Sequence, residues 1–152
     1  MNASKVVVFR AGTEEYGLPI QHVISIEKMI DVKPIPTMPI YMRGVVKVRG
    51  ELIPVVDVGY VFYQQNTEIM NETKLIVIQT DLLSIALIVQ EAKEILDIQK
   101  DQLKSISFGA FQTVKYFAGV ASVNERLITI LNPTLLIESL DLTLVKEEIG
   151  SH

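Results

Sequence analysis

Cysteine and tryptophan are absent from this 152-residue chain, and histidine occurs only at His22 and His152. Without cysteine the chain can form no disulfide and offers no thiolate nucleophile. His152 belongs to a charged, small-residue tail, so one histidine at most could ligate a metal in the folded body. That is too few for a zinc site of the usual ligand types, and no metal site is expected.

Long hydrophobic runs and an excess of positive charge are also missing. Hydrophobic residues make up 49% of the chain. They occur in short runs, well below the roughly 20 consecutive residues of a membrane-spanning helix. The N-terminal MNASKVVVF has one lysine and enters a strand-like run directly, so it predicts no signal peptide. The formal net charge is −4 and no Lys/Arg cluster is present, which disfavours nucleic acid as a partner and favours a protein.

What the chain does contain is an internal repeat. Segment 41–62 (YMRGVVKVRGELIPVVDVGYVF) matches segment 116–137 (YFAGVASVNERLITILNPTLLI) at an offset of 75 positions. Segment 5–26 matches segment 74–95 at an offset of 69. The identical pairs are Tyr41/Tyr116, Gly44/Gly119, Val45/Val120, Val48/Val123, Leu52/Leu127 and Ile53/Ile128, then Lys5/Lys74, Val8/Val77, Leu18/Leu87, Gln21/Gln90 and Ile26/Ile95. Two windows in the same order predict a duplicated chain with two similar halves.

Each half has the pattern of short β-strands separated by turns. Two hairpins are predicted around Arg49-Gly50-Glu51 and around Asn124-Glu125-Arg126, where Gly or Asn supplies the positive φ that a tight turn needs. The spacing over 23–29 is mixed between the strand and helix periods, so both remain open there. Prolines in segment 32–40 predict a loop. Short strands with frequent turns favour small barrels or a sandwich over alternating strands and helices.

Asp57 is the acidic residue best placed for acid–base chemistry, since it ends an apolar run. Its repeat counterpart is Asn132, which cannot ionise, so this position is predicted to cap a short helix in both halves. The sequence Asn132-Pro133 predicts such a helix as far as about Leu140. Gly44 and Gly50 belong to no phosphate-binding motif. We therefore predict a protein that is not an enzyme and holds no cofactor.

The segment MRGVVKVRGELIPVVDV, with Pro36 eight residues before Gly44, resembles the central motif of the CheW-like domain of bacterial chemotaxis. The residues that fit this pattern are Arg43, Gly44, Val45, Arg49, Gly50, Pro54, Val55 and Asp57. Flanking matches extend the resemblance over about 6–140. The chain departs from the pattern at Lys47, Val48, Ser25, Gln90, Ala92 and Asn132.

The resemblance implies an all-β fold with short helices, in which two small five-stranded SH3-like β-barrel subdomains are related by internal duplication. We expect one domain over 1–145 and a tail over 146–152. The first subdomain is expected mainly over 5–66 and the second mainly over 74–140, with their strands either sequential or interleaved.

The implied function is that of a non-enzymatic adaptor. It would couple the cytoplasmic tip of methyl-accepting chemoreceptors to the histidine kinase CheA, through the regulatory domain of that kinase. The implied location is the cytoplasm, with recruitment to membrane-associated receptor arrays and no direct insertion into the membrane. An adaptor for another chemosensory histidine kinase remains an alternative, as does a small β-barrel that binds a ligand or nucleic acid.

For the receptor contact, the resemblance points to Val23, Gly44, Arg49 and Ala92. The alternatives are a core position for Val23 and a backbone role for Gly44. Arg49 differs from these because its counterpart is Asn124, so the turn does not require the charge. A turn arginine can present its fork of donors to a partner carboxylate.

For the kinase contact, the resemblance leads to the connection after the strands of the first half. Met29, Lys33 and Ile35 are the candidates there, as apolar residues beside a charge. The alternative is that Met29 and Ile35 cover the core. In the second half the corresponding connection is longer, and Phe108 within it is the candidate for a separate contact.

Overall fold

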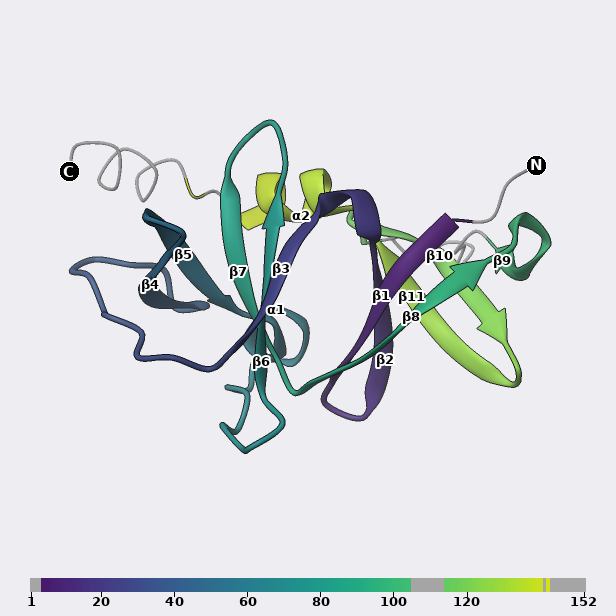
Figure 1. Ribbon diagram of the computed structural model, residues 1–152, viewed down its shortest axis with the longest axis horizontal. Helices are drawn as coiled ribbons and strands as arrows, with labels where there is room; N and C mark the ends of the chain where they lie inside the picture. Colours follow the sequence, from purple (N-terminus) through teal and green to yellow (C-terminus); the bar gives the residue numbers. More distant parts are fainter. Residues whose placement is uncertain (1–3, 105–113, 141, 143–152) are drawn as a thin grey trace.

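The computed structural model describes residues 4–104, 114–140 and 142, and its strands form two sheets (Figure 1). The strands are β1 (Ser4–Ala11), β2 (Glu14–Pro19), β3 (Val23–Lys28), β4 (Met42–Val48), β5 (Glu51–Asp57), β6 (Lys74–Gln79), β7 (Ser84–Val89), β8 (Glu91–Ile98), β9 (Leu103–Lys104), β10 (Phe117–Val123) and β11 (Arg126–Leu131). The helices are α1 (Val58–Tyr63) and α2 (Pro133–Leu140), with short 3-10 helices η1 (Ile20–His22) and η2 (Lys100–Gln102).

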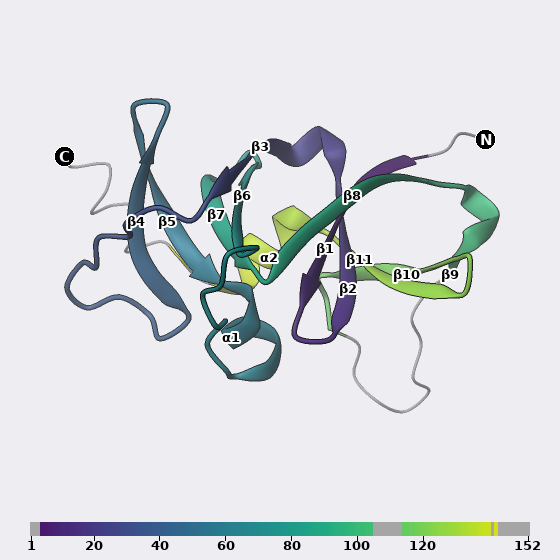
Figure 2. The ribbon, with the colours of Figure 1, turned by 60° about the horizontal axis from the view of Figure 1, so that its bottom comes forward.

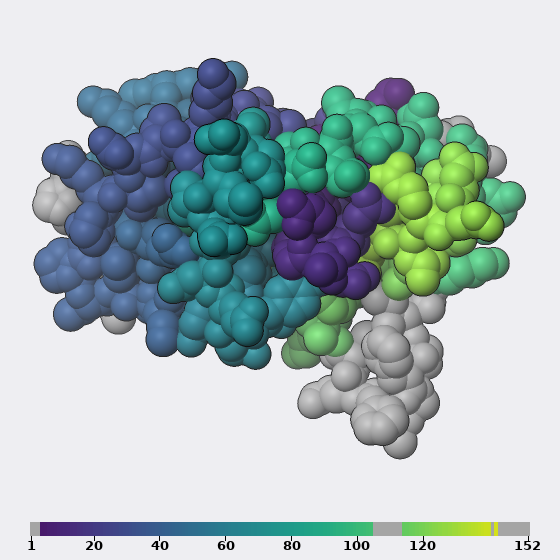
Figure 3. Space-filling model, turned by 90° about the horizontal axis from the view of Figure 1, so that it is seen from below, coloured from purple at the N-terminus to yellow at the C-terminus, as the bar shows by residue number. Residues whose placement is uncertain are grey.

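Each sheet takes strands from both halves of the repeat. Sheet A has the order β8-β1-β2-β11-β10-β9, and sheet B has the order β3-β6-β7-β5-β4. The β1–β2 hairpin of the first half therefore lies in the sheet of the second half, and β6–β7 makes the reciprocal exchange. In the space-filling view the dark purple β1–β2 hairpin is wedged against the green β10–β11 hairpin (Figure 3).

The two sheets repeat the same pairing scheme. In each, one parallel pair joins the exchanged hairpin to the host strands, β5 with β7 and β11 with β2. All other pairs are antiparallel. The predicted all-β fold with short helices and two similar subdomains is confirmed. Sheet A has a sixth strand, the two-residue β9, beyond the five that were expected.

Within the described part of the chain, three apolar clusters hold the sheets together. The central core takes side chains from both sheets and from α2, including Phe9, Leu18, Ile76, Ile78, Leu87, Leu131 and Leu136. A second cluster lies within sheet B, around Val55, Leu75 and Val77. A third lies within sheet A, around Val8 and Ile128. Along β1 and β6 successive residues alternate between the central core and the cluster of their own sheet, which explains why these strands are apolar on both faces.

An aromatic cluster ties the two halves together beside the central core. Phe62 of α1 stacks on Tyr116, with ring centroids 6.0 Å apart, and lies 4.6 Å from the ring of Tyr16. The hydroxyls of Tyr16 and Tyr63 share a hydrogen bond, and Tyr63 also donates to the carbonyl of Ala11. Burial raises the pKa of Tyr16 and of Tyr116, which keeps both phenols neutral. The helix of the first half thus packs on Tyr116 of the second half as well as on Tyr16 of its own half.

Candidate partner-binding surfaces

Strands β3 and β8 occupy equivalent places in the two sheets. Each forms one edge of its sheet, β3 beside β6 and β8 beside β1. Val23 begins β3, and Ala92, at the matching repeat position, is the second residue of β8. Figure 2 shows β8 crossing in front of β1 while β3 lies beside β6. Two of the four predicted receptor residues therefore lie on matching edge strands.

The register decides which side chains of these strands face the central core. Residues paired directly across an antiparallel ladder point to the same face. Val23 pairs with Ile78 and Ile26 with Ile76, and both partners belong to the central core. On the other edge, Ala92 pairs with Phe9 and Ile95 with Val7, which belong to the same core.

Ile26 and Ile95 remain 43% and 55% exposed although they lie on the central-core face of their strands. They are an identical pair in the repeat, so the two halves present the same side chain at the same place. We call Val23, Ile26, Ala92 and Ile95 the seam surface. The predicted site residues did not include the two isoleucines; the signal that could have found them is their identity at an offset of 69.

Gly44 and Arg49, the other two predicted receptor residues, lie apart from the seam surface on the β4–β5 hairpin. Gly44 is buried at φ +140, and a Cβ there would lie 2.1 Å from the carbonyl oxygen of Lys33. This absence of a side chain lets Lys33 pair with Val45 through hydrogen bonds of 2.9 and 2.8 Å. A backbone role for Gly44 therefore has a direct structural cause.

Arg49 is exposed at the tip of the hairpin, with φ 51 in the left-handed region. The hairpin loop consists of Arg49 and Gly50, since Val48 pairs with Glu51. Asn124 has φ 49 at the matching position of the β10–β11 hairpin. Asparagine tolerates this conformation far better than arginine does. The first half thus keeps a strained, solvent-facing arginine where the second half has a favourable turn residue.

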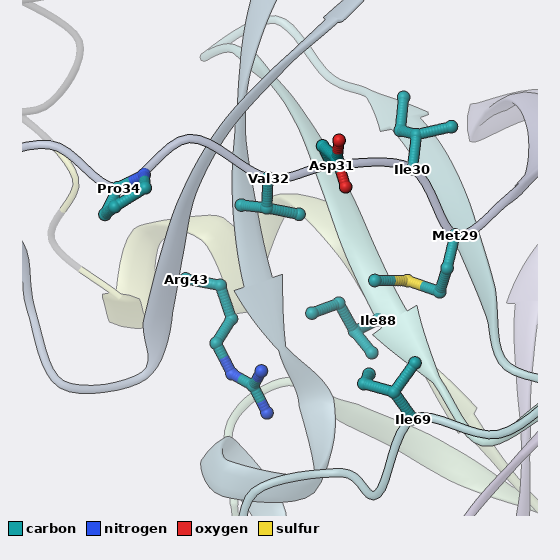
Figure 4. A pocket seen from close by; sticks show the side chains of 8 residues that line it. All are labelled: Met29, Ile30, Asp31, Val32, Pro34, Arg43, Ile69 and Ile88. Atoms are coloured by element: carbon teal, nitrogen blue, oxygen red, sulfur yellow. The ribbon is translucent and has the colours of Figure 1, made fainter.

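The connection between β3 and β4 borders a cleft of about 510 Å³. Its lining residues are Met29, Ile30, Asp31, Val32, Pro34, Arg43, Ile69 and Ile88. Figure 4 shows Met29, Ile69 and Ile88 directed toward the same space. Ile30 and Ile69 are 45% and 48% exposed, so the mouth of this β3–β4 cleft is apolar, with Asp31 and Arg43 among its polar residues.

The predicted kinase residues divide around this cleft. Met29 lines it and also packs on the cluster of sheet B. Lys33 is exposed and pairs with β4, whereas Ile35 packs on the central core. Phe108 lies outside the described residues. The structure therefore brings Met29 and Lys33 onto one connection, and adds Ile30 and Ile69, which the sequence did not single out.

Asp57 is the centre of a buried polar network. Its carboxylate is 1% exposed and caps α1 by accepting from the backbone of Gly59 at 2.9 Å. It also accepts from the backbone and hydroxyl of Thr67 at 2.9 and 2.6 Å, and pairs with Arg43 at 2.7 Å. Asn132 caps α2 through Leu135, as the repeat predicted. These partners are the start of α1, Thr67 and Arg43 of the same chain, which supports the interpretation of this position as a cap.

A charged network links strands β2, β8 and β11 of sheet A. Arg126 forms a two-point ion pair with Glu15 at 2.9 and 3.0 Å and reaches Glu94 at 3.1 Å. The hydrogen bonds to Glu15 raise the pKa of Arg126 further, so it stays charged. Among the described residues no group of three or more His, Asp or Glu side chains could hold a metal ion. No helix in that part of the chain has the length and apolar character to cross a bilayer.

Comparison with known proteins agrees with this architecture. The model of the CheW-like domain matches residues 5–141. The chain belongs to the CheW-like domain family. It is 26% identical over 147 residues to the chemotaxis protein CheW of Klebsiella aerogenes, covering 96% of this chain and 89% of that protein. It is 30% identical over 105 residues to CheW of Bacillus subtilis, covering 69% and 67%.

A solved structure shares the fold. The scaffolding protein TtCheW from Thermoanaerobacter tengcongensis superimposes with a TM-score of 0.76 at 25% identity, covering 87% of this chain and 85% of that one. The CheW-like family and the chemotaxis coupling adaptor predicted from the sequence are both confirmed. This CheW-like domain is a chemotaxis coupling adaptor.

Proposed function

We propose that this adaptor joins the cytoplasmic tip of a methyl-accepting chemoreceptor to the regulatory domain of the histidine kinase CheA. The receptor tip is assigned to the seam surface and the kinase to the β3–β4 cleft. On this proposal the protein works in the cytoplasm at receptor arrays, without catalysis, without a cofactor and without inserting into the membrane. Its role is to hold two partners at fixed relative positions.

The exposed isoleucines of the seam surface carry this proposal. Ile26 and Ile95 lie on equivalent edge strands, on the face toward the central core, and each keeps about half of its surface exposed. A receptor tip is helical, and an apolar face of a helix is bound by apolar side chains placed on a rigid support. Ala92 has little side chain, so it leaves room for such a helix but contributes less contact area than a valine would.

The β3–β4 cleft supports the assignment of the second partner. Met29, Ile30 and Ile69 form an apolar mouth, and Lys33 is exposed nearby. An apolar centre with a charged rim is the usual composition of a protein–protein interface. The seam surface and this cleft share no residue, so the two partners are assigned to different side chains.

Reconstitution tests the two assignments separately. Receptor tips, the kinase and this adaptor would be assembled in vitro, with ternary complex formation and kinase activity as readouts. Ile26→Ser with Ile95→Ser should weaken receptor binding about thirtyfold or more and leave kinase binding intact, because each change removes apolar contact worth about 1–2 kcal/mol. Leu127→Ser is the matched control, since Leu127 is 65% exposed on the β10–β11 hairpin away from the seam surface.

A separate variant tests the assignment of the kinase to the β3–β4 cleft. Ile69→Ser should weaken kinase binding and leave receptor binding unchanged. If the isoleucine pair at the seam and Leu127→Ser weaken receptor binding equally, the seam assignment is wrong. If the wild-type protein neither binds the kinase nor restores receptor control of it, the coupling function as proposed fails altogether.

A further inference from the structure

We propose that a third docking site lies between η1 and α2, and that it takes an extended, uncharged segment of a partner protein. The site is a cleft of about 450 Å³ lined by Pro19, Gln21, His22, Ala118, Ile130, Leu131, Asn132, Pro133, Thr134 and Leu135. A neighbouring hollow of about 270 Å³ shares Gln21, His22 and Thr134 with it. This η1–α2 cleft shares no residue with the seam surface or the β3–β4 cleft.

The internal repeat identifies an equivalent site beside sheet B, and that site is occupied by a segment of the chain itself. Each lining residue has a counterpart at an offset of 75 or 69, so Ala118, Asn132 and Thr134 correspond to Arg43, Asp57 and Gly59, and Gln21 corresponds to Gln90. Beside sheet B these counterparts are covered by the chain's own segment 65–68. Figure 2 shows the part of the chain that follows α1 folded back beside that helix.

The contacts of segment 65–68 define the binding mode. Thr67 donates its backbone N–H and its hydroxyl to Asp57, at 2.9 and 2.6 Å. The side-chain amide of Gln90 donates to the carbonyl of Glu68 at 3.0 Å, and Arg43 donates to the carbonyl of Thr67 at 3.3 Å. A Cβ on Gly59 would lie 2.6 Å from the hydroxyl of Thr67, so the segment is seated directly on the start of α1.

Beside sheet A the frame of this site is present, and among the described residues no segment is hydrogen-bonded over it as 65–68 is beside sheet B. Gln21 is exposed, as Ala118 is, and among the described residues only the amide of Leu135 is bonded to the side chain of Asn132. His22 is held at the border of the cleft by a 3.1 Å contact between its Nδ1 and the carbonyl oxygen of Gln79. It lies half-buried in η1.

The chemistry of the lining selects an uncharged segment. The ion pair of the first half is replaced by an alanine and an amide, so no carboxylate or guanidinium lines this cleft. An unpaired charge placed there would lose hydration without gaining a partner. The amides of Gln21 and Asn132 suit peptide carbonyl and N–H groups, and the space that Arg43 occupies in the first half is open above Ala118 for an apolar side chain.

A peptide that copies the chain's own segment 64–71 can be used to test binding to the cleft. A capped octapeptide with the sequence of residues 64–71 and Glu68→Gln, QQNTQIMN, would be titrated into isotope-labelled full-length protein and followed by NMR. We expect saturable shifts at Gln21, Ala118, Asn132 and Thr134, with a dissociation constant of about 1 mM, because a short flexible peptide loses much conformational freedom on binding.

Two substitutions locate the binding. Ala118→Arg should weaken it at least about tenfold, because the new side chain fills the space as Arg43 does in the first half. Ser122→Arg adds the same charge on the same strand outside the cleft and should change it by less than about twofold. Gln21→Ala should weaken it about fivefold through the loss of one hydrogen bond. Thermal unfolding of each variant shows whether it remains folded.

Four results would overturn the proposal. They are the absence of binding at millimolar peptide, equal weakening by Ala118→Arg and Ser122→Arg, nuclear Overhauser contacts between residues 143–152 and Ala118 in the free protein, and shifts at Ala118 that depend on protein concentration. The third result would assign the cleft to the chain's own C-terminal segment, and the fourth would assign it to a second copy. None of them bears on the receptor and kinase assignments, which are tested by different residues.

Discussion

Asp57 and Asn132 occupy the same position in the two halves, yet their surroundings differ sharply. Both cap the helix that follows, and both lie at the end of a strand that pairs in parallel with the exchanged hairpin. Asp57 is also buried under Thr67 and paired with Arg43, whereas Asn132 lines an open cleft. Both halves therefore keep a side chain that caps the following helix. They differ in the charge of that side chain and in whether a described segment covers it.

The largest expected effect that separates the two positions comes from Asp57→Ala. This change removes the α1 cap, leaves the donors of Thr67 without an acceptor and leaves Arg43 without its partner. We expect a loss of about 3–4 kcal/mol in the free energy of unfolding, measured in urea. A loss near 1 kcal/mol would mean that the network contributes no more than an ordinary cap.

Gly44→Ala should have the next largest effect. Its new Cβ would meet the carbonyl of Lys33 at 2.1 Å, and φ is +140 there, so we expect a loss of about 3 kcal/mol in the free energy of unfolding. Gly119→Ala is the matched control, because the carbonyl of Lys104 lies at 2.7 Å in the second half. Equal losses at the two glycines would show that the backbone carbonyl packs against Gly119 as closely as against Gly44.

Asn132→Ala tests the same position in the second half. Only the cap of α2 is lost, so the free energy of unfolding should fall by about 1 kcal/mol in the same urea titration. Asn132→Asp retains a capping carboxylate and should be nearly neutral. A loss as large as that of Asp57→Ala would contradict the open character of the η1–α2 cleft.

The smallest effect is expected from exchanging the turn residues. Arg49→Asn should raise the free energy of unfolding by about 0.5–1 kcal/mol, because asparagine tolerates the left-handed φ better than arginine does. Asn124→Arg should lower it by a similar amount. If Arg49 binds the receptor, Arg49→Asn will also weaken receptor coupling despite the gain in stability. A stabilised variant with unchanged coupling would assign Arg49 to an ordinary hairpin turn.

Much of the fold could be predicted because its signals are local. The caps at Asp57 and Asn132, the α2 helix to Leu140 and the two hairpins all follow from short segments whose backbone preferences act within a few residues. Segment 23–29 stayed ambiguous between strand and helix because a bulge between Val23 and Ser25 breaks the period of two on β3.

The candidate site was harder to predict than the fold. Val23 and Ala92 were expected from the family resemblance, but their relation to Ile26 and Ile95 depends on which residues of β6 and β1 they face. Ile69 joins the β3–β4 cleft from a loop 40 positions away from Met29 in the chain. Such proximity has no local signal, since it arises only when distant segments pack.

The family, the duplication, the strands and the helix caps could all be predicted from residue identities. Each depends on residues close together in the chain or on matching positions of the repeat. The tertiary structure alone decided that β1–β2 and β6–β7 exchange sheets. Two halves with the same strand pattern offer nearly the same pairing partners within a half and between halves. Only the packing of both hairpins around one central core selects the exchanged arrangement, and with it the seam surface and the η1–α2 cleft.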